Sequence, residues 1–273
     1  MKYRDWHPIL RIESEYSRQI KKLLDRVFRQ FDFLEPARQI EEFIHSELFY
    51  NLSMRIAGRM ITATRVDNAR NWRQAASIST RGRDIYQALK LQMQGPMGNL
   101  IRAQIDYNAS LIRSTPIDIS IKMTHHIQQE ALKGRRAEDI VDDLKVWMPN
   151  ITKSRANLIA RTEVSKASTA LTRAQSYELG LRWYVWRTSE DGRVRQSHRN
   201  MDGVLIKWTD PPSPEQLARK KYQYGHYQAG EIFNCRCYAE PLVDPDYVKW
   251  PHKIYSNGKI SWINRKDFER LIS

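Results

Sequence analysis

The stretch YELGLRWYVWRT, residues 177–188, decides the fold, because the chain changes there from a helical to a strand pattern. Before it, small and apolar residues recur at helical spacing from about Thr152 to Leu179, and Gly180 is typical of a helix end. After it, Arg182 to Thr188 show the period of about two that indicates a strand. We therefore predict an α+β protein in which a long helix packs on a small antiparallel sheet.

Turn residues divide the chain beyond this strand into short elements. Glu190-Asp191-Gly192 and Asp202-Gly203 predict turns, and a second strand follows at Val204–Trp208. Residues 209–234 hold prolines, lysines and tyrosines and predict a long, mobile connection. Asn257-Gly258, between two short strand-like runs, predicts a tight hairpin.

The first half of the sequence predicts helices almost throughout. Helical spacing covers residues 9–31 and runs from Pro36 to about Met93, with a break near residues 68–71 and a stop at Gly95-Pro96. Three shorter helices are then expected, separated by Pro116, Gly134 and Pro149, at residues 99–113, 117–132 and 137–147. We expect three regions: a basic helical region at 1–149, an α+β domain at 150–243, and a hairpin with a short helix at 244–273.

Composition excludes several classes of protein. The chain has 273 residues, 41% of them hydrophobic, with a formal net charge of +14 and a pI of about 9.8, so it can bury a core. No run of about 18 apolar residues occurs, and the N-terminus lacks the pattern of a signal peptide, so we expect no membrane span, no export and a reducing cytoplasm. Phosphate-cradling glycine loops, H-E-x-x-H and G-x-S-x-G are absent, which leaves most enzyme classes without support.

Arginines are concentrated in residues 51–113 of the helical half. Guanidinium groups bind phosphate oxygens in pairs of hydrogen bonds, so this segment predicts non-specific, salt-dependent contact with double-stranded DNA. A solvated helix face, or a surface for an acidic protein, is the alternative. The candidate nucleic-acid-binding residues are Arg55, Arg59, Arg65, Arg70, Arg73, Arg81 and Arg83.

Glu163 lies in the middle of a small, apolar helix face and is therefore expected to be buried. A buried carboxylate needs a cation or several donors. The following segment supplies Asp191, Arg193, Arg195, His198 and Asp202 within twelve residues. We favour a structural ion network that pins the helix to the sheet over an acid/base site formed by Glu163, His198 and a carboxylate.

Cys235 and Cys237, the two cysteines of the chain, are separated by one residue. On a strand both thiols point to the same face, where they could bind a metal together with His198. A fourth ligand would then be His226, Asp191 or water. We favour the interpretation that both cysteines are free thiols packed in the core, so no cofactor is expected. A zinc site is the alternative.

Several of these residues form an ordered series that resembles the phage Mu F-like head morphogenesis domain of minor head proteins in tailed phages. The resemblance covers about residues 150–243, and the helical half matches no motif. The matching positions, in chain order, are Ala160, Arg161, Thr162, Glu163, Gly180, Trp186, Asp191, Arg193, Arg195, His198, Asp202, Gly203, Asn234, Cys235, Arg236 and Cys237.

The resemblance implies a virion protein at the portal vertex that acts in head assembly and in DNA packaging or ejection, with no catalytic residue. Its partners would be the portal protein, other head proteins such as capsid and scaffold, and double-stranded DNA, with no membrane. It would lie in the phage head and, during assembly, in the host cytoplasm. Two alternatives remain: a metal-dependent nuclease or other enzyme using Glu163, His198 and Asp202, and a plain nucleic-acid-binding protein of the host.

Overall fold

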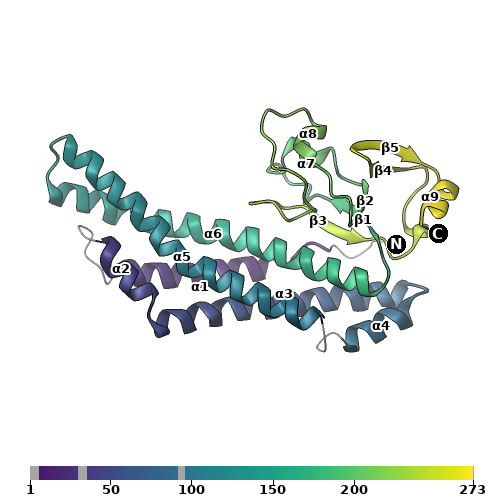
Figure 1. Cartoon of the computed structure of the whole chain (residues 1–273), viewed down its shortest axis with the longest axis horizontal. Coiled ribbons are helices and arrows are strands. Elements are labelled where there is room, and N and C mark those ends of the chain that lie inside the picture. The colour runs from purple at the N-terminus through teal and green to yellow at the C-terminus, as the bar shows by residue number, and fades with distance from the viewer. Residues whose placement is uncertain (1–5, 30–35, 92–95, 273) are drawn as a thin grey trace. The chain divides into compact units, whose positions relative to one another are not determined.

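The computed structural model describes residues 6–29, 36–91 and 96–272 and contains long helices followed by a small sheet (Figure 1). The chain forms two compact units, each assembled from separate segments. We call them the helical unit, Leu10–Thr62 with Ile101–Ala160, and the sheet unit, Met1–Ile9 with Ala63–Leu100 and Arg161–Ser273. The predicted α+β class, with its helical first half, is confirmed.

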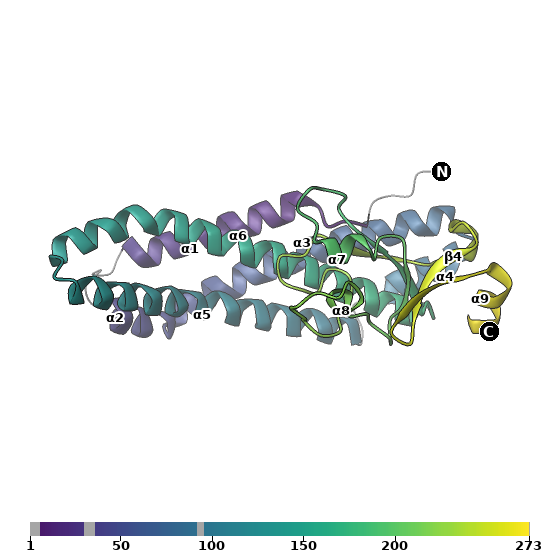
Figure 2. The same ribbon diagram turned by 90° about the horizontal axis from the view of Figure 1, so that it is seen from above.

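In the described residues, the first part of the chain forms six helices. Their bounds are α1 Leu10–Arg29, α2 Pro36–Ile44, α3 Glu47–Ile78, α4 Gly82–Leu91, α5 Pro96–Leu132 and α6 Ala137–Glu178. The predicted end of the first helix at Phe31 and the predicted stop at Gly95 lie outside the described residues. In the helical unit α1 runs beside α6 (Figure 2), where Ser17 Oγ donates to Asn157 Oδ1 at 2.6 Å.

Two predicted helix breaks at prolines are wrong, since Pro116 lies inside α5 and Pro149 inside α6. A proline in a helix removes one hydrogen bond, which costs about 3 kcal/mol. Ile112 and Ile119, on either side of Pro116 in sequence, are buried on the same side of the helix. Their burial offsets the lost hydrogen bond. The boundary expected between residues 149 and 150 therefore falls within a continuous helix.

The break predicted near residues 68–71 is also wrong, because α3 continues through it. Asn68 is buried, and its amide donates to Thr172 Oγ1 of α6 at 2.7 Å. Asparagine disfavours helices because its side chain can form hydrogen bonds with its own backbone. Here the side chain is hydrogen-bonded to another helix instead.

The sheet has five strands in the order β3-β1-β2-β4-β5. Its pairs are antiparallel except β2 with β4, which is parallel, so the sheet is mixed rather than purely antiparallel. The strands are β1 Trp183–Arg187, β2 Leu205–Lys207, β3 Tyr238–Pro241, β4 His252–Ser256 and β5 Lys259–Ile263. Short helices connect or follow them: α7 Gln196–Arg199, α8 Pro214–Leu217, the 3-10 helix η1 Pro245–Tyr247 and α9 Arg265–Ile272.

Strand β1 shows why the alternating pattern predicted the sheet. Tyr184 and Trp186 enter one buried cluster, while Trp183 and Val185 enter another that contains Phe268 of α9. Because successive side chains of a strand point to opposite faces, β1 is buried on both sides. Both buried clusters therefore include side chains of β1.

Backbone geometry confirms the predicted helix end at Gly180 and the predicted hairpin turn at Asn257-Gly258. Gly180 has φ +70°, and Leu181 N donates to Ser176 O at 2.8 Å, which closes the end of α6. Asn257 and Gly258 have φ +49° and +78° and join the antiparallel strands β4 and β5. Among the described residues, no helix is long and apolar enough to cross a membrane.

Candidate functional site

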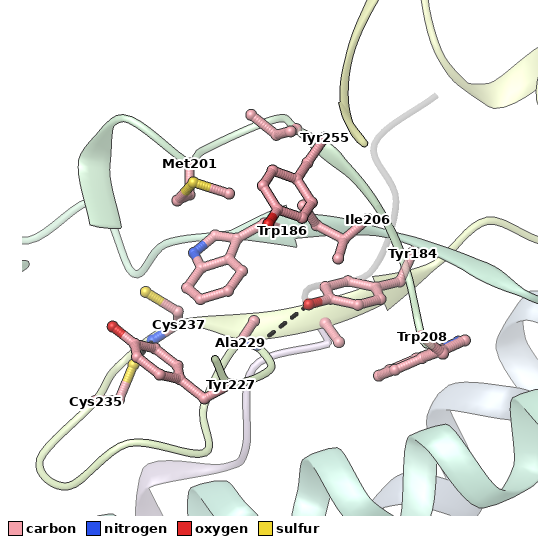
Figure 3. Close-up of a cluster of buried hydrophobic side chains, with 12 residues drawn as sticks. Tyr184, Trp186, Met201, Ile206, Trp208, Tyr227, Ala229, Cys235, Cys237 and Tyr255 are labelled. Atoms are coloured by element: carbon pink, nitrogen blue, oxygen red, sulfur yellow. Dashed lines mark hydrogen bonds between the residues drawn. The ribbon is translucent and has the colours of Figure 1, made fainter. Parts of the chain in front are cut away.

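His198 and the two cysteines converge in the core of the sheet unit. His198 lies on α7, and Cys235 and Cys237 lie in the irregular segment just before β3 rather than on a strand. His198 Nδ1 is 3.5 Å from Cys235 Sγ and 3.3 Å from Cys237 Sγ. All three residues are buried, and both cysteines are free. Figure 3 shows the two thiols beside Trp186 and Tyr227.

The other ring nitrogen of His198 faces a buried carboxylate and a phenol. His198 Nε2 is 2.9 Å from Tyr227 Oη and 3.5 Å from Glu215 Oε1. Tyr227 Oη donates to Glu215 Oε2 at 2.6 Å, and Ser197 Oγ donates to Glu215 Oε1 at 3.0 Å. Burial and the neighbouring Glu215 raise the pKa of Tyr227 far above its usual range, so the phenol stays a donor.

The two thiols are electrostatically coupled. A hydrogen bond from the Cys237 thiol lowers the pKa of Cys235, and His198 lowers it further despite burial. The same contact and burial raise the pKa of Cys237. The hydrogen bond between the two sulfur atoms thus shifts the two pKa values in opposite directions, down for Cys235 and up for Cys237.

Helix α6 fixes the turn that precedes the cysteines. Arg161 Nη1 donates to Asn234 Oδ1 at 2.7 Å, and Thr162 Oγ1 accepts from Asn234 N at 3.0 Å. Asn234 has φ +56°, a left-handed conformation that asparagine tolerates. These bonds aim Cys235 into the core.

The turns around residues 188–203 are held by the remaining motif side chains. Asp191 accepts from Arg193 N at 2.9 Å and pairs with Arg236 at 2.6 Å. Asp202 Oδ1 accepts from Thr188 N at 2.8 Å. Arg195 donates to Phe233 O at 2.9 Å. Asp191 and Asp202 thus fix loops, and the carboxylate beside His198 is that of Glu215.

Glu163 is buried, as its helix face predicts, but it does not join this network. Its partner is Lys166 of the same helix, at 3.1 Å, and its Oε2 atom has no hydrogen-bond partner among the described residues. The predicted role of pinning the helix to the sheet through Glu163 is therefore wrong. Hydrogen bonds tie the helix instead to the loop before β3: Arg161 and Thr169 donate to Asn234 and Ala229 O, and Thr162 accepts from Asn234 N.

We expect Glu163→Gln to stabilise the protein by about 1 kcal/mol at pH 7, because it removes a buried charge without leaving a buried cation. Burial raises the pKa of Glu163 against the opposing effect of Lys166. The protonated carboxyl therefore favours the folded state. That contribution is complete below the unfolded pKa, near 4.3, and is lost as pH rises through the raised folded pKa.

The measurement is the difference in Tm between wild type and Glu163→Gln from pH 4 to pH 8. The difference should be small at pH 4, and the Tm of the variant should exceed that of wild type by more as pH rises. Lys166→Gln should behave oppositely and lose stability as pH rises. A Glu163→Gln protein that melts lower at every pH would contradict this account.

The candidate arginines do not form one group. Arg65, Arg70, Arg73, Arg81 and Arg83 belong to the sheet unit, and Arg81 donates to Leu179 O at 2.7 Å, which caps the end of α6. Arg55 and Arg59 belong to the helical unit.

Arg55 and Arg59 line a groove of about 900 Å³ between α3 and α1. We call it the basic groove; α1 contributes five further basic residues to it, namely Arg18, Lys21, Lys22, Arg26 and Arg29. Of its described lining residues, Asp25 alone is acidic. Arg18 and Lys21 pair with Glu15 and Asp25, whereas the other basic side chains form no ion pair with a described residue.

Two parts of these sites were missed by sequence reasoning. Glu215 and Tyr227 lie in the connection that was predicted to be mobile, yet both are buried. The prolines at 211, 212 and 214 restrict that backbone and were a usable signal. The basic side of α1 was missed because its acidic residues lower the net charge of the segment.

The part of the chain that carries the motif residues matches a known protein family. Residues 122–240 match the family model described as Phage Mu protein F like protein. The resemblance is thus confirmed for this part of the chain. The Mu F-like region contains every motif residue from Arg161 to Cys237.

A relative from Haemophilus influenzae, described as an uncharacterized protein, is 32% identical over 137 residues. The aligned part is 50% of this chain, which spans 28% of that relative's length. No solved structure matches the chain.

Proposed function

We propose that the protein is a minor head protein of a tailed phage that acts at the portal vertex in head morphogenesis and in DNA packaging or ejection. The observation that carries the proposal is the Mu F-like match over residues 122–240. The ordered hydrogen bonds of the motif residues agree with a structural role, because each of them fixes a turn or a helix contact.

Mass spectrometry of purified heads from the phage or prophage that encodes the chain tests this proposal. We expect the protein in mature heads at a few copies per portal, and deletion of its gene should reduce the yield of DNA-filled heads. Heads that contain none of the protein and assemble normally without it would overturn the proposal.

The basic groove supplies the DNA contact of this proposed function. Five of its basic side chains form no ion pair with a described residue, so phosphates could bind them without first breaking one. Each phosphate neutralised by arginine or lysine releases condensed counterions, so such binding is salt-dependent and reads no sequence. The groove presents no base-reading motif.

We expect Arg55→Gln with Arg59→Gln to weaken binding to unrelated DNA duplexes about equally, by roughly tenfold at moderate salt. The salt slope should fall by about 2, because two phosphate contacts are lost. Fluorescence anisotropy over a salt series measures both quantities.

Arg70→Gln with Arg73→Gln is the matched control, since both side chains are exposed on the same helix but lie in the sheet unit. This control should change affinity less than the groove variant. An unchanged slope in the groove variant would mean that the groove does not bind DNA.

A further inference from the structure

We propose that His198, Cys235 and Cys237 bind one Zn²⁺ ion that holds the Mu F-like motif together. This goes beyond the proposed head function and does not depend on it. The ligand atoms of the three residues lie within 4.8 Å of one another, and they form the single group of three or more such residues in the described chain.

The spacing of the ligand atoms fits tetrahedral zinc. Zn–S bonds of about 2.3 Å and Zn–N bonds of about 2.05 Å at the tetrahedral angle place sulfur and nitrogen about 3.6 Å apart. The two sulfur-to-Nδ1 distances are 3.5 Å for Cys235 and 3.3 Å for Cys237. The side chains therefore need to move by only a few tenths of an ångström to accept the ion.

The hydrogen bonds of His198 favour the tautomer that a metal requires. Nε2–H can donate to Tyr227 Oη at 2.9 Å, while Tyr227 donates its own proton to Glu215. Ser197 supplies the second proton donated to Glu215. Every polar group in this chain of bonds is then satisfied, and the Nδ1 lone pair points toward the two sulfurs. Metal-binding histidines are commonly oriented in this way by a carboxylate behind the ring.

The donor set selects the metal. Two thiolates and one imidazole are soft to borderline ligands, which zinc binds and which magnesium and calcium do not. No other described His, Cys, Asp or Glu joins the group, so Asp191 and His226 are not the fourth ligand. A water molecule takes that position in our proposal. Because the three ligands are buried, the ion acts as a structural cross-link between α7 and the segment before β3.

Packed free thiols, the reading favoured from the sequence, explain this arrangement less well. Thiols that only fill space in a core do not require a histidine nitrogen close to both sulfur atoms. They also do not require a buried carboxylate behind that histidine. Both features are present here.

The test is elemental analysis of the full chain, purified without chelator and dialysed against metal-free buffer. We expect close to one zinc per chain. His198→Gln and Cys237→Ser should each lose the zinc. His226→Gln, which alters an exposed histidine in the connection of residues 209–234, should keep it. Chelation should lower Tm by about 10 °C or more, because metal binding contributes to folding.

Cobalt substitution in the wild-type chain keeps the proposal testable if the variants do not fold. We expect one Co²⁺ per chain with a thiolate-to-cobalt charge-transfer band and tetrahedral d–d absorption, both displaced by zinc. Wild-type protein that takes up neither metal, or that binds cobalt without the thiolate band, would overturn the proposal. Unchanged melting with chelator would do the same.

Discussion

Gly230→Ala is expected to destabilise the protein by about 3 kcal/mol, because the position has neither room nor a suitable backbone conformation for a side chain. Its φ is +88°, and an added Cβ would lie 2.7 Å from Thr169 Oγ1 and 2.8 Å from Ser165 Oγ. Cys237 O would be 3.0 Å away. Thr169 Oγ1 also donates to Ala229 O at 2.7 Å, so the clash would separate this segment from α6.

Gly203→Ala is the matched control. Gly203 has φ +74° but nothing within 4 Å of an added Cβ, so the control measures backbone strain alone, about 1 kcal/mol. Urea unfolding followed by tryptophan fluorescence compares the two free energies of unfolding. Equal losses in both variants would show that the close approach to α6 contributes nothing.

The sequence predicted those features of the fold that depend on neighbouring residues. The alternation of Arg182 to Thr188, the helix end at Gly180 and the hairpin at Asn257-Gly258 all follow from local backbone preferences. Local preference also explains the errors. Pro116 and Pro149 disfavour a helix, but burial of the residues around them outweighs that preference, and burial depends on partners distant in sequence.

The candidate site was predicted unevenly for the same reason. His198, Cys235 and Cys237 could be grouped because their residue types suggest a shared chemistry. Glu215 could not be assigned to His198, since sixteen residues that include strand β2 separate them and no periodicity relates the two positions. The partner of Glu163 was wrongly sought on the sheet because a helical wheel shows which face is buried and not what lies against it.

The basic groove illustrates a further limit of sequence reasoning. Net charge along a segment hides the basic side of α1, because Glu13, Glu15 and Asp25 offset its arginines and lysines. The structure separates these charges: the acidic residues mostly pair locally, and Arg26 and Arg29 line the groove.

Glu215→Ala is expected to lower the free energy of unfolding by about 2–6 kcal/mol. The carboxylate is 3% exposed and accepts from Ser197 and Tyr227, which are themselves buried. Its removal leaves two buried donors without their acceptor, at about 1–3 kcal/mol each. Glu269→Ala is the control, because its pair with Arg265 is exposed and should contribute less than about 1 kcal/mol.

Two readouts separate the packing role of Glu215 from its effect on His198. Urea unfolding with chelator present measures the loss of the hydrogen bonds alone, and it should exceed the loss in Glu269→Ala. Zinc competition measures the orientation of His198, and removal of a carboxylate behind a metal-bound ring weakens affinity by roughly 10- to 100-fold. A stability loss with unchanged zinc affinity would show that Glu215 organises the core without positioning the histidine. A loss no larger than that of Glu269→Ala would contradict the buried network itself.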